Sequence, residues 1–106
     1  IMLDVLISGA AGSDLIAARG RDMLMGNFEA KGPVWLAIKD LGLALESAKR
    51  LGVVLPMAGL YQQLLLNAHY SGWDQRDATV VMTIYEQLAG IKRKAKQGTE
   101  SQRELG

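Results

Sequence analysis

The sequence contains no cysteine among its 106 residues, which excludes disulfide bonds, thiol nucleophiles and cysteine-based zinc sites together. Its single histidine excludes a metal site built from several histidines. The sequence also has no excess of one charge, because its twelve Lys and Arg residues nearly balance its eleven Asp and Glu residues, which gives a formal net charge of +1. Without a strong overall field, neither a nucleic acid nor a membrane surface is indicated as a partner.

Long apolar runs are absent as well, since none approaches the roughly 18 residues that a membrane span needs. What remains is the composition of an ordinary globular domain, with 49% hydrophobic and 22% charged residues. Residues 1 to 4 lack the basic segment that opens a signal peptide, so we expect a cytoplasmic protein. The chain does not begin with Met, and we expect it to be part of a longer polypeptide.

The residue types favour helix, because Leu, Ala, Met, Lys, Glu and Gln are frequent and aromatic residues make up only 6%. Residues 1 to 7 are expected to end a helix whose beginning is missing. Ser13 is predicted to cap a second helix that stops near Gly26. Gly20 should make this helix short or irregular, because glycine in a helix costs about 1 kcal/mol relative to alanine.

The clearest predicted helix covers residues 34 to 51, where apolar residues recur at three- and four-residue spacing. Gly52 supplies its C-cap, and Pro56 can open the next helix, over residues 57 to 70. The expected architecture is therefore all-α.

A final helix is predicted to end near Ala89, with Asp74 and Asp77 as its candidate caps. Together with the preceding segments, it brings the expected number of helices to about five. The domain is accordingly assigned to residues 1 to 90.

Residues 91 to 106 differ from the rest of the chain. They carry five basic residues against Glu100 and Glu104, a local charge of +3, and almost no apolar side chain. We expect them to form a basic, poorly ordered tail. Nucleic-acid binding by the basic run at residues 92 to 96 is the weaker interpretation, because no aromatic residues alternate with the basic ones to stack bases.

General catalytic motifs are missing from the sequence. Gly9 and Gly12 do not form a Gly-x-Gly-x-x-Gly motif, and neither a phosphate loop nor His-Glu-x-x-His nor Gly-x-Ser-x-Gly occurs. His69 is interpreted as a surface or packing residue, because its spacing to other residues supplies no orienting partner for acid–base catalysis. No metal ligands are identified.

One set of motifs is more informative. Residues 38 to 48 read IKDLGLALESA, and the link LGVVLP, the pair Gly72-Trp73 and Asp77 follow in that order. Upstream, residues 12 to 24 hold a Ser-containing helix that precedes an Asn-Phe loop. This ordered set resembles the C-terminal helical domain of the β-hydroxyacid dehydrogenases. That 6-phosphogluconate dehydrogenase-like family includes 3-hydroxyisobutyrate dehydrogenase, tartronate semialdehyde reductase and L-threonate dehydrogenase.

The resemblance covers about residues 3 to 90 and implies a specific role for one residue. In the family, the lysine of the Lys-Asp-Leu motif faces the cleft between two domains and contacts the nicotinamide cofactor or the substrate; here it is Lys39. The local pattern is compatible, since Lys39 lies off the apolar stripe and Gly42, one turn on, permits a close approach. An ammonium group suits an anionic acid or a cofactor phosphate.

The chain departs from the family in three ways. The family's catalytic lysine belongs to a Gly-x-x-x-Lys-x-x-x-Asn helix, whereas Gly90 and Lys94 are followed by Gly98 in place of Asn. The catalytic lysine is therefore missing from this sequence, and the dinucleotide-binding domain is missing too. We expect both, together with the long first helix, to lie upstream. Residues 31 to 34 read KGPV where many members have Gly-Phe, which favours the branch that acts on sugar acids such as threonate.

The resemblance thus implies a fragment of an enzyme that transfers a hydride between a small β-hydroxy acid and NAD or NADP. The fragment alone should hold no cofactor and no catalytic residue, and it should be inactive. Loss of the first helix should leave an apolar surface bare, which predicts a homo-oligomer. The alternative is a stand-alone, non-catalytic helical module for oligomerisation or interaction.

Overall fold

The computed structural model describes residues 1 to 92, which form five α-helices and one 3₁₀ helix. The elements are α1 (Met2–Ser8), α2 (Asp14–Met25), α3 (Val34–Leu51), α4 (Pro56–Tyr70), η1 (Ala78–Val81) and α5 (Met82–Leu88). Within residues 1 to 92 there is no strand, so the predicted all-α fold is confirmed. The tail predicted to be poorly ordered lies, from residue 93 onward, outside the described residues.

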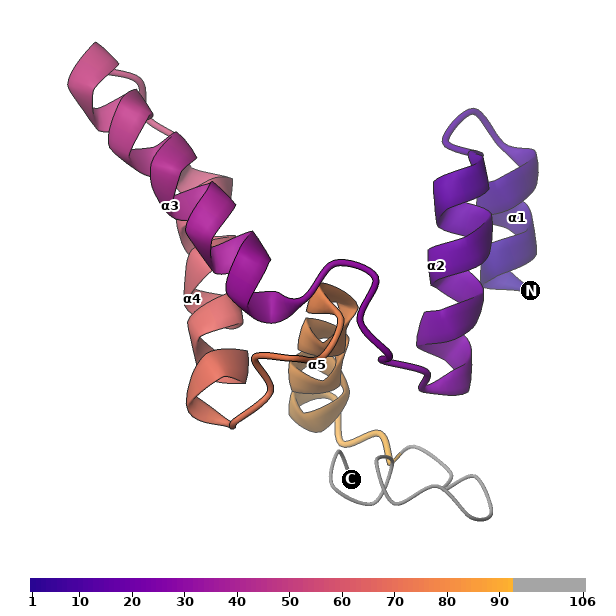
Figure 1. Cartoon of the computed structure of the whole chain (residues 1–106). Helices are drawn as coiled ribbons and strands as arrows, with labels where there is room; N and C mark the ends of the chain where they lie inside the picture. Colours follow the sequence, from indigo (N-terminus) through magenta and orange to yellow (C-terminus); the bar gives the residue numbers. More distant parts are fainter. Residues whose placement is uncertain (93–106) are drawn as a thin grey trace.

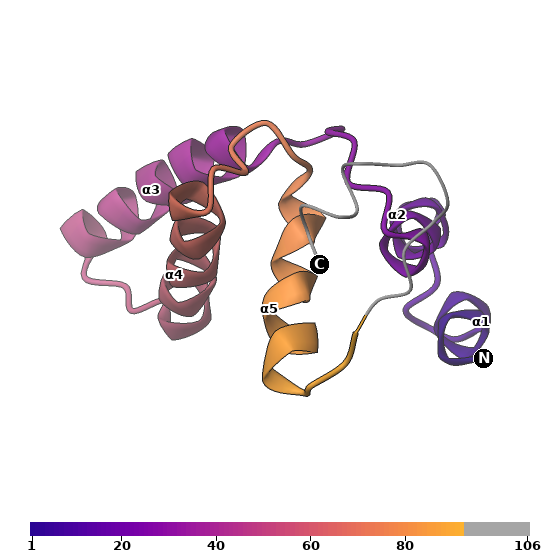
Figure 2. The same ribbon diagram turned by 90° about the horizontal axis from the view of Figure 1, so that it is seen from below.

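The helices are arranged as two hairpins. One consists of α1 and α2, the other of α3 and α4, and α5 lies between them in both views (Figures 1 and 2). The free end of the α3–α4 hairpin points away from all other helices (Figure 1). None of the helices within residues 1 to 92 is long and apolar enough to cross a bilayer.

The predicted helix ends are largely confirmed. The Ser13 hydroxyl accepts a hydrogen bond from the Ile16 N–H at 3.0 Å, which satisfies a free donor at the start of α2. Gly26 and Gly52 end α2 and α3 with φ angles of 70° and 72°, a left-handed conformation that glycine adopts without strain. Pro56 is the first residue of α4, where its missing N–H costs nothing.

Gly20 does not shorten α2, contrary to the expectation from its helix propensity. The helix continues without interruption for 12 residues. A Cβ atom at residue 20 would collide with the Leu3 side chain of α1, so the glycine allows the two helices of this hairpin to pack closely.

Gly12, in the turn between α1 and α2, should tolerate substitution poorly. A Cβ atom there would collide with the backbone carbonyl of Ile7, which cannot move aside as a side chain could. We expect Gly12→Ala to lower the free energy of unfolding by about 1–3 kcal/mol, measured by urea titration with circular dichroism. Gly42→Ala is the control, because no atom lies within 4 Å of a Cβ at that helical position. Equal stability of Gly12→Ala and the native chain would show that the turn is less tightly closed.

The core lies where α3, α4, η1 and the loop before α3 meet. Its buried members are Phe28, Val34, Leu65, Ala68 and Val80, and partly buried side chains surround them. Leu65 and Ala68 carry the buried face of α4, whereas Leu60 on the same helix is 60% exposed.

Backbone hydrogen bonds tie the loop before α3 to the segment before η1. The Asp77 N–H donates to the Phe28 carbonyl at 2.9 Å, and the Ala78 N–H donates to the Gly32 carbonyl at 2.8 Å. The Val34 N–H donates to the Arg76 carbonyl at 2.9 Å. These bonds fix the start of α3 next to the start of η1.

The predicted final helix is correct only in part. Asp77 caps the 3₁₀ helix η1, and the α-helical part starts four residues later than Ala78, at Met82. Asp74 caps neither element, because its carboxylate contacts the imidazole of His69 instead.

Candidate functional site

A groove with a volume of about 710 Å³ lies between α2 and the N-terminal half of α3. Most of its wall is apolar, with Ile16 and Met23 on α2 facing Leu36 and Ala37 on α3. Arg19, Asp40, Asp77 and Thr79 contribute polar groups to the wall. A groove of this size and mixed chemistry falls within the range of small-molecule sites in proteins.

Asp77 joins several of the segments that line this groove. The side chain is buried, with Asp77 only 3% exposed. Its Oδ1 accepts hydrogen bonds from the Arg19 guanidinium at 2.6 Å and from the Lys31 and Gly32 N–H groups at 3.1 and 2.9 Å. Its Oδ2 accepts from the Thr79 N–H at 3.1 Å and from the Thr79 hydroxyl at 2.6 Å. One carboxylate thus links α2, the loop before α3 and η1.

These contacts also set the charge state of Asp77. Burial alone would raise the pKa of the carboxyl, because removal from water disfavours the charged form. The hydrogen bonds from Thr79, Gly32 and Lys31 outweigh burial and hold the pKa of Asp77 well below its ordinary range. The carboxylate is therefore ionised at any physiological pH.

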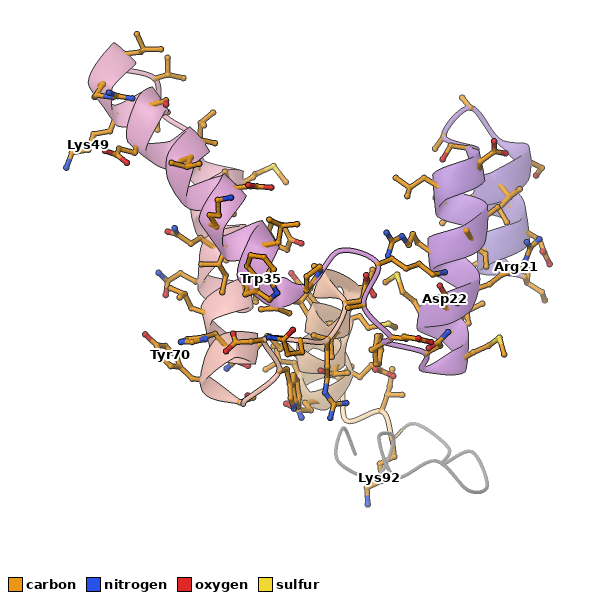
Figure 3. All side chains as sticks on the ribbon, viewed as in Figure 1. Arg21, Asp22, Trp35, Lys49, Tyr70 and Lys92 are labelled. Atoms are coloured by element: carbon orange, nitrogen blue, oxygen red, sulfur yellow. The ribbon has the colours of Figure 1, made fainter. Side chains whose placement is uncertain are left out.

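A second ion pair lies close to the first. The Lys31 ammonium contacts the Asp22 carboxylate at 2.7 Å, and Asn27 donates to the same carboxylate at 3.3 Å. The hydrogen bond from Lys31 lowers the pKa of Asp22. Figure 3 labels Asp22 near the C-terminal end of α2, so this pair connects that helix end to the loop before α3.

Lys39 lies on α3 beside the groove residue Asp40, but it does not itself line the groove. Its side chain is exposed, and no described residue forms a hydrogen bond or ion pair with it. A Cβ atom at Gly42, one turn along, would meet no atom within 4 Å. The ammonium is therefore available to an anion that approaches this open face of α3, and the binding role of Lys39 stays a prediction.

His69 has an orienting partner, contrary to the interpretation from sequence spacing. Its Nδ1 lies 2.6 Å from Oδ1 of Asp74, and both residues are partly exposed. Together with Trp35, Ile38, Leu66 and Gln75 they line a small pocket of about 290 Å³. Among the described residues, neither a nucleophile nor a further titratable group lines this pocket beside the pair.

Sequence reasoning identified Asp77 as a cap but missed its contact with Arg19. The two residues are 58 positions apart, and no local pattern connects them. The Asp-x-Thr spacing at residues 77 to 79 was the available signal for the Thr79 contacts. Within residues 1 to 92, His, Asp and Glu side chains do not gather in any group of three that could hold a metal ion.

Comparison with known proteins adds a family. The sequence profile of the family described as NAD-binding of NADP-dependent 3-hydroxyisobutyrate dehydrogenase matches residues 1 to 85. The match includes Lys39, the groove and Asp77, and it ends within α5.

Individual relatives point the same way. L-threonate dehydrogenase of Pectobacterium atrosepticum is 30% identical over 94 residues, 89% of this chain and 31% of that protein. The 2-hydroxy-3-oxopropionate reductase of Escherichia coli is 32% identical over 87 residues, 82% of this chain and 30% of that protein. The 2-(hydroxymethyl)glutarate dehydrogenase of Eubacterium barkeri is 33% identical over 69 residues, 65% of this chain and 23% of that protein. The chain spans less than a third of the length of these curated relatives.

Proposed function

Because the chain belongs to the 3-hydroxyisobutyrate dehydrogenase family, we propose that residues 1 to 90 are the C-terminal helical domain of an oxidoreductase. The parent enzyme transfers a hydride between a small β-hydroxy acid, such as a sugar acid, and NAD or NADP. The names of the relatives support this class of reaction, since the three compared above are dehydrogenases or a reductase.

The observation that carries the proposal is the position of Lys39 within the matched region. Residues 1 to 92 contain no strand, so this part of the chain offers no strand-to-helix glycine turn for a dinucleotide phosphate. A contribution to NAD or substrate binding by these residues would come from a helix or a loop, and Lys39 is an exposed cation on α3 that pairs with no described residue.

The open face of α3 fits an anionic ligand. The space beside Gly42 allows close approach to the helix backbone, and the Lys39 ammonium lies one turn before it. When bound, the nicotinamide cofactor itself accepts or donates the hydride. Lys39 would bind and orient a carboxylate or phosphate, while the Asp77 contacts hold the groove wall and the start of α3 in place.

The mass and activity of the native protein test this proposal. The polypeptide purified from its source should have a mass several times 11.5 kDa. It should reduce NAD or NADP with one member of a panel containing L-threonate, 3-hydroxyisobutyrate and 2-(hydroxymethyl)glutarate, followed by nicotinamide absorbance. The 106-residue chain alone should show no turnover. A native mass near 11.5 kDa would contradict the assignment to a larger enzyme.

A stand-alone module for helical oligomerisation is the second candidate. It is favoured by the many exposed apolar side chains, among them Met57 at 84%, Val54 at 81% and Leu88 at 81%. Soluble monomers rarely leave large apolar patches uncovered. A native mass near 11.5 kDa together with self-association would support this second function.

A further inference from the structure

The pocket beside the His69–Asp74 pair is separate from the groove and has no part in the proposed hydride transfer. The two share no lining residue. The pocket has a volume of about 290 Å³, just below the range of about 300–1,000 Å³ that drug-sized ligands occupy. Any occupant must therefore be small.

Three segments form the walls of this pocket, and backbone hydrogen bonds hold them together. The Trp35 N–H, on the first turn of α3, donates to the Asp74 carbonyl at 3.2 Å. The Trp73 N–H donates to the Ala68 carbonyl on α4 at 3.0 Å. Figure 3 labels Trp35 at this end of α3. Because the walls are fixed by the fold, a ligand would pay little to order them.

The charge of the pocket comes from Asp74. Its Oδ1 lies 2.6 Å from the His69 Nδ1, whereas its Oδ2 forms no hydrogen bond with a described residue. With the imidazole neutral, the pair keeps a net negative charge. Gln75 adds a neutral amide, and Lys39 does not line the pocket. The pocket therefore attracts a positive charge.

Trp35 adds a second feature that favours a cation. Its side chain lines the pocket and the residue is 46% exposed, although tryptophan is a large apolar residue. The face of an indole ring attracts cations, and this chain already uses that attraction where Arg76 lies over the Trp73 ring, 5.8 Å from its centroid. Within the described part of the chain, no cation lies over Trp35.

Other classes of ligand fit this pocket less well. An anion would be repelled by Asp74. A neutral apolar molecule would remove the carboxylate from water without offering it a partner, which is unfavourable. A metal ion would need more ligands, since His, Asp and Glu side chains of residues 1 to 92 form no group of three around any point. An organic cation satisfies both the carboxylate and the indole.

We propose that this pocket binds a small organic ammonium ion. Its positive charge faces the Trp35 ring and the Asp74 carboxylate, and its carbon groups contact the apolar side chains of Ile38 and Leu66. The inference does not rest on the proposed enzymatic function, because none of these four residues has a part in it.

A pair of probes that differ only in charge tests the proposal. The 106-residue chain is titrated at pH 8 and constant ionic strength with choline, and separately with 3,3-dimethyl-1-butanol, its neutral carbon isostere. Choline should shift the NMR signal of the Trp35 indole N–H in a saturable way. The isostere should bind at least about tenfold more weakly, because it lacks the charge that the indole and the carboxylate attract.

Substitutions assign the binding to the two residues. Trp35→Leu and Asp74→Asn should each raise the dissociation constant of choline about fivefold or more. His69→Leu removes the contact with Asp74 but keeps the carboxylate charge, so this variant should bind choline at least as tightly as the native chain. Asp4→Asn is the matched control for charge, because it removes an exposed carboxylate on α1 and should leave the dissociation constant unchanged.

Circular dichroism verifies that each variant keeps its helix content. Absence of saturable choline binding would overturn the proposal, and so would equal affinity for choline and its isostere. Native affinity in both Trp35→Leu and Asp74→Asn would also overturn it, because choline would then bind elsewhere. If Asp74→Asn lost helix content, Trp35→Leu and the comparison of the two probes would decide.

Discussion

Asp77→Asn should lower the free energy of unfolding by about 3–5 kcal/mol, the range observed when one partner of a buried ion pair is removed. Both carboxylate oxygens accept hydrogen bonds, Oδ1 from Arg19 and two backbone N–H groups and Oδ2 from Thr79. The amide NH₂ of an asparagine must replace one of these oxygens and would face donors in either orientation. Small domains are stable by about 5–15 kcal/mol, so the loss is a large fraction of the total.

Urea titration followed by circular dichroism measures this change. Asp4→Asn is the control, because the Asp4 side chain on α1 is 88% exposed and its ion pair with the chain terminus is 4.0 Å long. The control should shift the midpoint little, as exposed pairs contribute at most about 1 kcal/mol. An equal effect of the two substitutions would contradict the linking role of Asp77.

Acid should remove the same stabilisation from the native chain. Because the pKa of Asp77 is lower in the folded than in the unfolded state, its contribution is fully present above the ordinary carboxyl pKa of about 3.9. The contribution is lost as the pH falls below that value. The difference in stability between the native chain and Asp77→Asn should therefore narrow below about pH 4.

The helices were predictable because their ends are encoded locally. Ser13 caps the start of α2, Gly52 caps the end of α3 and Pro56 opens α4, as their backbone and side-chain chemistry predicts. The apolar repeat from residues 34 to 51 gives α3 with both ends correct. The prediction for Gly20 was wrong, because this glycine makes room for the Leu3 side chain of another helix and does not interrupt its own helix.

The site was less predictable, since it depends on contacts between distant segments. Arg19 on α2 meets Asp77 across 58 positions of sequence, a contact that no local pattern indicates. His69 and Asp74 are separated by five positions across a helix end, a spacing without a recognisable motif. Lys39 is proposed only through its resemblance to a family motif, because an exposed helical lysine carries no signal of its own.

In the parent enzyme, Lys39→Ala should lower kcat/KM about 10²-fold, the effect of removing a single group that stabilises developing or bound negative charge. Stability should remain unchanged, since no described residue pairs with Lys39. Lys39→Arg keeps the positive charge and should recover part of the activity, although its planar head differs in geometry. The effect rests on the proposed function and is measured by steady-state kinetics.

The KM values for the hydroxy acid and for the cofactor show which of these two ligands Lys39 binds. A rise in the hydroxy-acid KM alone would assign the ammonium to the substrate carboxylate, and a rise in the NAD or NADP KM would assign it to the cofactor. Lys49→Ala is the matched control, because Lys49 is an exposed lysine on the same helix, nearly three turns further along. If Lys39→Ala were as active as Lys49→Ala, Lys39 would be a solvated surface residue, and the open face of α3 would lie outside the active site.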